Sequence, residues 1–149
     1  MIVVDSSAVV TILCGEAEAE LFSDIMEAGD ARDMSAANML ETSMVMHNRL
    51  GAIAHQSVDE FITDADVDII DVTCRTADIA FGAFRRFGKG AGRPSVLNFG
   101  GCFSFALAQE LNLPLLFEGN DFSKPTSRRQ PKQYPKIFIA PYTPAPVSP

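Results

Sequence analysis

Residues 2–13 read Ile-Val-Val-Asp-Ser-Ser-Ala-Val-Val-Thr-Ile-Leu, an apolar run that is interrupted by Asp5 and then resumes with helical spacing. The apolar residues before Asp5 predict a short buried strand, and Ser6 or Ser7 can cap the helix that follows. Because ligands of open α/β sheets gather beyond the carboxyl ends of the strands, Asp5 is the first candidate site residue. The alternative is that Asp5 itself caps the helix and has no chemical role.

The alternation of strand and helix patterns continues along the chain. Helical patterns are expected at residues 16–27, 36–50, 55–65, 73–87 and 98–111, and further strands at 67–72, 113–117 and 136–140. Strands separated by helices predict a single α/β domain with a mostly parallel central β-sheet, flanked by helices on both faces. We expect this domain to span residues 1–140, followed by a flexible Pro-rich tail at 141–149.

Composition limits the number of domains, the class of protein and its compartment. The 149 residues fit one domain, and 47% hydrophobic with 21% charged residues is ordinary for a globular protein. The three cysteines are far apart and include no C-x-x-C pair, which favours neither a zinc ribbon nor a disulfide framework and suits the cytoplasm. Since Asp5 interrupts the first apolar run, no signal peptide is expected. No segment approaches the roughly 20 apolar residues of a membrane span.

Two further acidic residues belong near Asp5 in this topology. Glu41 lies in the second turn of the helix expected after Ser35, and Asp121 follows the strand at 113–117. Carboxylates gathered without a nearby lysine or histidine repel one another unless a cation lies between them, and oxygen ligands favour Mg²⁺ or Mn²⁺. Taken singly, Glu41 can be an exposed helical residue and Asp121 a turn residue; only their joint placement makes a site.

The charge is distributed unevenly. Residues 1–84 carry 16 acidic and 3 basic side chains, whereas residues 85–149 carry 3 acidic and 9 basic ones. Arg85, Arg86, Lys89 and Arg93 begin the basic half, which could attract a phosphate backbone or an acidic protein segment, and they are candidates for RNA binding. A solvated surface with scattered bases is the alternative. The nearby Phe81, Phe84 and Phe87 recur every three residues, which predicts a core or dimer-face stripe rather than a base-stacking platform.

Four segments resemble one family in its own order: IVVDSSAVVTIL, MSAANMLETSMV, RRFGKGAGRPSVLNFGGCFSFALA and LPLLFEGNDFSK. Over roughly residues 1–126 the chain resembles PIN-domain proteins, specifically the VapC-type toxins of toxin–antitoxin pairs. The resemblance implies a ribonuclease that uses Mg²⁺ or Mn²⁺ held by four carboxylates. It also implies inhibition by a VapB-like antitoxin and assembly as a homodimer.

Residue by residue, Asp5, Glu41 and Asp121 match acidic positions of that family. Ser7 matches a small hydroxyl residue that supports the first aspartate, and Asn98 an asparagine that precedes the third acidic position. That third position is Gly101 here, since Gly100-Gly101-Cys102 stands where the family has Gly-Asp-Cys. Glycine offers no oxygen ligand. The alternative function is therefore a catalytically impaired PIN-fold protein that retains antitoxin or RNA binding.

Overall fold

The computed structural model describes residues 1–88, 97–119 and 137–139, and its centre is a five-stranded sheet of order β3-β2-β1-β4-β5. The strands are β1 (Ile2–Val4), β2 (Arg32–Ser35), β3 (Val67–Ile70), β4 (Pro114–Leu116) and β5 (Ile137–Ile139). The first four pair in parallel, while β5 runs antiparallel to β4 at the edge. The expectation of a mostly parallel sheet is confirmed. The tail expected at 141–149 lies outside the described residues, and the domain boundary at 140 stays a prediction.

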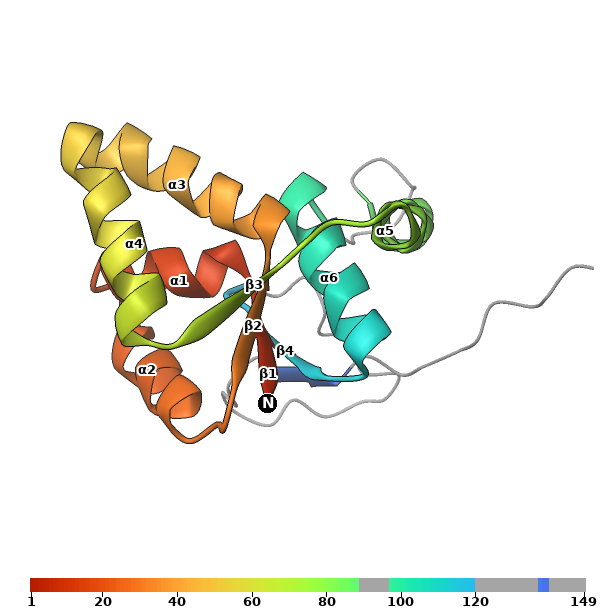
Figure 1. The fold of residues 1–149 in the computed structure, drawn as a ribbon, viewed down its shortest axis with the longest axis horizontal. Helices are drawn as coiled ribbons and strands as arrows, with labels where there is room; N and C mark the ends of the chain where they lie inside the picture. The colour runs from red at the N-terminus through yellow and green to blue at the C-terminus, as the bar shows by residue number, and fades with distance from the viewer. Residues whose placement is uncertain (89–96, 120–136, 140–149) are drawn as a thin grey trace, which may run out of the picture.

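Helices cover both faces of this sheet, as expected. They are α1 (Ser6–Leu13), α2 (Ala19–Glu27), α3 (Ala36–Leu50), the 3₁₀ turn η1 (Gly51–Ile53), α4 (Ala54–Asp64), α5 (Cys74–Phe87) and α6 (Phe99–Leu111). Helices α1, α2 and α4 lie on one side of the sheet and α6 on the other, with α5 packed outside α6 (Figure 1). The described helices have lengths and compositions that leave none able to cross a lipid bilayer.

The core is divided by the central strand β1. Ile2 and Val4 pack with Phe22 and Met26 of α2, whereas Val3 packs with Leu107 of α6. Successive side chains of a strand point to opposite faces, so a strand covered on both faces must be apolar throughout. This requirement explains why the run before Asp5 is apolar without interruption.

Strand β2 was not anticipated from the sequence. Its first two residues, Arg32 and Asp33, are polar, although it pairs with β1 on one side and β3 on the other. The Arg32 guanidinium donates to the carbonyl oxygens of Met26 (2.7 Å) and Gly29 (3.0 Å), which ties the strand to the end of α2. Parallel strands between two layers are usually apolar, and this one is held in place by tertiary contacts instead.

Candidate active site

Asp5 lies where β1 ends and α1 begins, and it is 8% exposed. Its Oδ2 accepts hydrogen bonds from the backbone N (2.9 Å) and Oγ (2.6 Å) of Ser7. Its Oδ1 accepts from Oγ of Ser104 (2.6 Å) and Nδ2 of Asn38 (3.3 Å). The helix cap is thus Asp5, and the expectation of Ser6 or Ser7 in that role was wrong. Capping of α1 uses only Oδ2 of Asp5. Its Oδ1 instead accepts from side chains of other helices.

Glu41 reaches the same pocket from α3. Ser35 caps this helix by accepting from the backbone N of Ala37 (3.3 Å), so α3 begins at the same sheet edge as α1. Oε2 of Glu41 accepts a hydrogen bond from Oγ of Ser6, the residue next to Asp5. Burial raises the pKa of Glu41 above its ordinary value, and the negative charge of Asp5 raises it further. The structure therefore brings together two of the three acids selected from the sequence.

The first turn of α6 closes the pocket. Asn98 caps this helix, its Oδ1 accepting from the backbone N of Gly101 at 2.7 Å. Any Cβ on Gly100 would overlap the carboxylate of Glu41, so position 100 needs glycine for Glu41 to stay in place. A Cβ on Gly101 would lie 3.0 Å from Cδ2 of Leu97 and 3.1 Å from Oδ1 of Asn98, which small side-chain shifts relieve. Glycine at position 101 is not dictated by space.

Asn38 and Ser104 were missed in the sequence. Asn38 is fully buried, and its Nδ2 donates both to Asp5 and to the carbonyl oxygen of Gly100 (3.0 Å). Among the described residues, nothing hydrogen-bonds its Oδ1. Helical spacing was the available signal, because Asn38 precedes Glu41 by three positions and Ser104 follows Gly101 by three, so each shares a helix face with a residue already selected.

Comparison with known proteins agrees with these features. The chain matches the PIN domain family over residues 2–126. This chain belongs to the PIN-domain family of VapC ribonucleases. Ribonuclease VapC28 of Mycobacterium tuberculosis is 40% identical over 120 residues, which cover 80% of this chain and 90% of that protein. Ribonuclease VapC of Mycolicibacterium smegmatis is 42% identical over 120 residues, covering 80% of this chain and 92% of the relative.

Solved structures show the same fold. The crystal structure of M. tuberculosis VapC20, a sarcin-ricin loop cleaving toxin, superposes with a TM-score of 0.67 at 18% identity, covering 81% of this chain and 92% of that one. A toxin–antitoxin complex from Klebsiella pneumoniae gives a TM-score of 0.61 at 15% identity, covering 83% of this chain and 91% of the other. At these identities the likeness concerns the fold alone.

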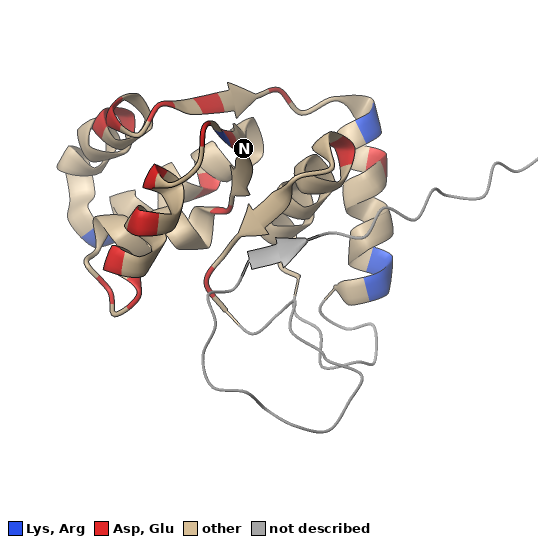
Figure 2. Cartoon of the chain, turned by 90° about the horizontal axis from the view of Figure 1, so that it is seen from below, with Lys and Arg blue, Asp and Glu red and all other residues tan. Residues whose placement is uncertain are grey.

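Two basic side chains of the PIN domain lie at the end of α5. Arg85 and Arg86 are exposed in its last turn, and the carbonyl oxygen of Phe87 accepts from the backbone N of Leu97 at 3.0 Å. The end of α5 is therefore joined to the start of α6, which borders Glu41. Figure 2 shows basic segments at both ends of α5, whereas acidic segments are spread over the helices on the other side of the sheet. Lys89, Arg93 and Asp121 lie outside the described residues.

The donors in the pocket suit a hard cation. Within residues 1–88, 97–119 and 137–139, no three His, Cys, Asp or Glu side chains converge as metal ligands do. The described pair, Asp5 and Glu41, offers only carboxylate oxygens, the donors that Mg²⁺ and Mn²⁺ prefer. A cation beside them would also offset the repulsion that contributes to the raised pKa of Glu41. The residues present fit such an ion, with fewer carboxylates than the four that the resemblance implies.

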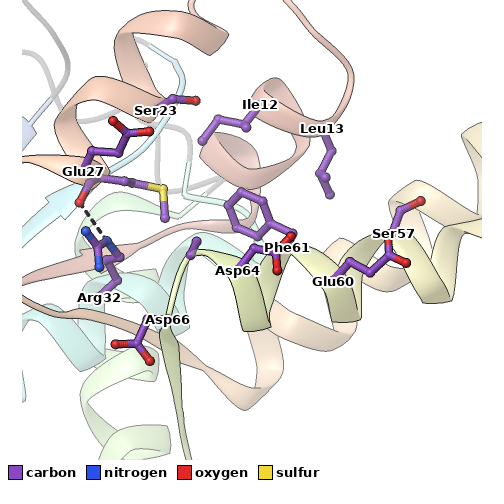
Figure 3. A pocket seen from close by; sticks show the side chains of 12 residues that line it. Ile12, Leu13, Ser23, Glu27, Arg32, Ser57, Glu60, Phe61, Asp64 and Asp66 are labelled. Carbon is purple, nitrogen blue, oxygen red and sulfur yellow. Dashed lines mark hydrogen bonds between the residues drawn. The ribbon is translucent and has the colours of Figure 1, made fainter.

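A hollow of about 560 Å³ lies away from these acids, between α1, α2 and α4. Apolar side chains, among them Leu13 and Phe61, form its walls, and carboxylates surround them. Figure 3 shows Arg32 at one end of this hollow, hydrogen-bonded to a backbone carbonyl oxygen rather than pointing freely into the space. An acidic rim repels phosphate, so this hollow does not suit the RNA backbone.

Proposed function

We propose that this PIN domain is a VapC-type toxin that hydrolyses RNA phosphodiester bonds with Mg²⁺ or Mn²⁺. The observation that carries the proposal is the meeting of Asp5 and Glu41 at the carboxyl ends of parallel strands, in a chain 40% identical to proteins named ribonuclease VapC. Asp5 and Glu41 would hold the ion, together with Asp121. When bound, such an ion activates a water molecule and stabilises the leaving oxygen of a phosphodiester.

The surrounding side chains of this chain position the acids. Ser7, Ser104 and Asn38 donate hydrogen bonds to Asp5, which hold its carboxylate in one orientation. Ser6 does the same for one oxygen of Glu41. Arg85 and Arg86, with Lys89 and Arg93, supply positive charge that attracts the RNA backbone. Each of these groups acts before the reaction by fixing geometry or by concentrating substrate.

Gly101 weakens this site. No oxygen ligand is present where the resemblance implies a carboxylate, and loss of a direct ligand lowers activity by more than the roughly 10- to 100-fold that outer-shell changes cost. The second candidate function is therefore a catalytically impaired PIN-fold protein that binds a VapB-like antitoxin or RNA. It is supported by the geometry at position 101, where a Cβ would need only small shifts of Leu97 and Asn98, so space does not dictate glycine there.

Partners follow from the family. A structural neighbour is titled a toxin–antitoxin complex, which supports a VapB-like antitoxin as the partner of this chain. Homodimerisation and a cytoplasmic location are part of the same proposal, as is a domain extending from residue 1 to 140.

Cleavage of total RNA by the purified chain tests the proposal. The parent, Gly101→Asp and Asp5→Ala are compared with Mg²⁺, with Mn²⁺ and with EDTA. Cleavage by the parent that Asp5→Ala and EDTA abolish supports an active nuclease. Cleavage only by Gly101→Asp supports an impaired protein that lacks one ligand. If none of the three cleaves RNA, or if cleavage persists in EDTA, the nuclease proposal fails.

A further inference from the structure

Phe99 is the first residue of α6 and is 79% exposed, more than any other large apolar side chain described in this chain. It is adjacent to Gly100, whose Cα lies against the carboxylate of Glu41. An aromatic ring is thus presented to solvent at the border of the acidic pocket. Burying such a ring favours folding, so its exposure calls for a reason outside the fold.

The ring of Phe99 is held in place by its own helix. Its centroid lies 5.0 Å from that of Phe103, one turn further along α6, and the two rings meet edge to face at 70°. This geometry is the favoured one for an aromatic pair. Phe103 therefore contacts Phe99 from its own helix and leaves most of the Phe99 ring exposed. An exposed flat ring suits stacking on a base.

Other exposed rings extend this surface along α5. Phe81, Phe84 and Phe87 are 62%, 45% and 38% exposed, so they do not form a core stripe, and the dimer face expected as the other possibility stays a prediction. The ring of Phe84 lies against Cα of Gly88, which pairs with Leu97 in a parallel bridge two residues before Phe99. The contact of Phe84 with Gly88 and the Gly88–Leu97 bridge therefore connect the exposed rings of α5 to the start of α6.

Positive charge accompanies these rings. Arg85 and Arg86 lie between Phe84 and Phe87 in the sequence and are exposed in the same turn of α5. Proteins that bind single-stranded nucleic acid combine a basic surface for phosphates with aromatic rings for bases. An acidic protein segment would also be attracted by the arginines, but the combination of positive charge with exposed flat rings matches the phosphates and bases of RNA. This combination favours RNA as the occupant.

We propose that Phe99 stacks on an unpaired RNA base beside the site of Asp5 and Glu41, with Arg85 and Arg86 contacting neighbouring phosphates. This inference rests on the proposed ribonuclease function and adds a binding site for a substrate base. It makes single-stranded or loop RNA the substrate class, because a base inside a duplex has no free face to stack. Phe99 acts by positioning the strand rather than by reacting.

Fluorescence offers a direct test, since the chain contains no tryptophan. Phe99→Trp introduces a single indole at the proposed stacking position, and Ile53→Trp introduces one on η1, where Ile53 is 63% exposed. Both variants are titrated with a short oligouridylate, first in EDTA so that no cleavage occurs and then with Mg²⁺. Quenching of the indole at position 99 and not of that at position 53 is expected.

Affinity gives a second readout. Phe99→Ala should weaken oligouridylate binding by about 5- to 150-fold, because base–aromatic stacking contributes about 1–3 kcal/mol and each 1.4 kcal/mol is tenfold. Phe99→Tyr keeps a flat ring and should bind as the parent does. Circular dichroism confirms that the variants are folded, which the exposure of Phe99 leads us to expect.

Other outcomes overturn the proposal. Equal quenching at positions 99 and 53, or no loss of affinity in Phe99→Ala, would show that Phe99 does not contact the base. A blue shift of the indole at position 99 that grows with protein concentration, without RNA, would assign the surface to a second copy of the chain. If the nuclease test fails while quenching at position 99 is specific, the stacking site stands and the catalytic proposal falls.

Discussion

The pocket around Asp5 and the first turn of α6 face each other across the candidate site, but they are equipped differently. Asp5 receives hydrogen bonds from three side chains on three different helices. The first turn of α6 contributes two glycines and a capping asparagine, but no carboxylate. One glycine is required by the position of Glu41 and the other is not. The difference teaches that the hydrogen bonds that position Asp5 are all present, although the opposite side of the site, at Gly101, lacks a carboxylate.

The largest expected effect comes from removing the carboxylate of Asp5. Asp5→Ala deletes a helix cap and removes a charged acceptor of Asn38 and Ser104, which keep backbone carbonyl acceptors at Gly100 and Gly101. The free energy of unfolding should fall by about 2–4 kcal/mol. RNA cleavage should be lost, measured in the parent or in Gly101→Asp, whichever cleaves. Urea denaturation and a cleavage assay measure the two effects.

Asp24→Ala, at an exposed carboxylate of α2, is the matched control and should change neither quantity. Asp5→Asn keeps the shape of the side chain and separates lost chemistry from lost folding. Full RNA cleavage by Asp5→Asn would mean that the carboxylate of Asp5 has no catalytic role.

Ser104→Ala tests one hydrogen bond of the same pocket. Its Oγ lies 2.6 Å from Oδ1 of Asp5, and hydrogen bonds to charged groups contribute about 1.5–3 kcal/mol. We expect a loss of stability in that range and slower cleavage, because Asp5 gains rotational freedom. Ser57→Ala is the control, since in the described part of the chain Oγ of Ser57 donates only to the backbone carbonyl oxygen of Ile53. It should change neither the stability nor the rate of RNA cleavage much.

The two glycines of α6 should respond in opposite ways to alanine. In Gly100→Ala the new methyl group displaces the flexible carboxylate of Glu41, so cleavage should fall strongly while the fold survives. In Gly101→Ala the methyl group needs only small shifts, and the better helix propensity of alanine offsets them by up to about 1 kcal/mol. Cleavage rates and melting temperatures of both variants decide this comparison, and equal losses of activity would refute the distinction between the glycines.

The smallest expected effect concerns Asp33, a buried acid far from this comparison in β2. Burial raises its pKa, and Asp68, its neighbour across the β2–β3 pair, raises it further. The folded state therefore binds this proton more tightly than the unfolded chain, so stability falls as the pH rises through the folded pKa. Asp33→Asn should stabilise the protein at neutral pH by about 0.2–1 kcal/mol and reduce that pH dependence. Melting temperatures across an acidic to neutral series measure it, and an unchanged profile would contradict the assignment.

Local patterns predicted most elements because their signals are local. Thr73 and Asn98 cap α5 and α6 next to the expected starts, and α3 spans the residues expected. Strand β2 was the exception. Arg32 and Asp33 are poor residues for a buried strand, and only contacts with α2 and with two neighbouring strands place them there. Sequence periodicity does not contain that information.

By itself, the sequence determined the alternation of strands and helices, Asp5 at the end of the first strand, and the absence of a carboxylate at Gly101. These follow from residue type and spacing along the chain. Only the tertiary structure decided that Asn38 and Ser104 hold Asp5, that Gly100 must be glycine, and that Phe99 is exposed at the border of the site. The physical reason is that contacts between residues far apart in the chain depend on how helices pack across the sheet, and no local pattern encodes those distances.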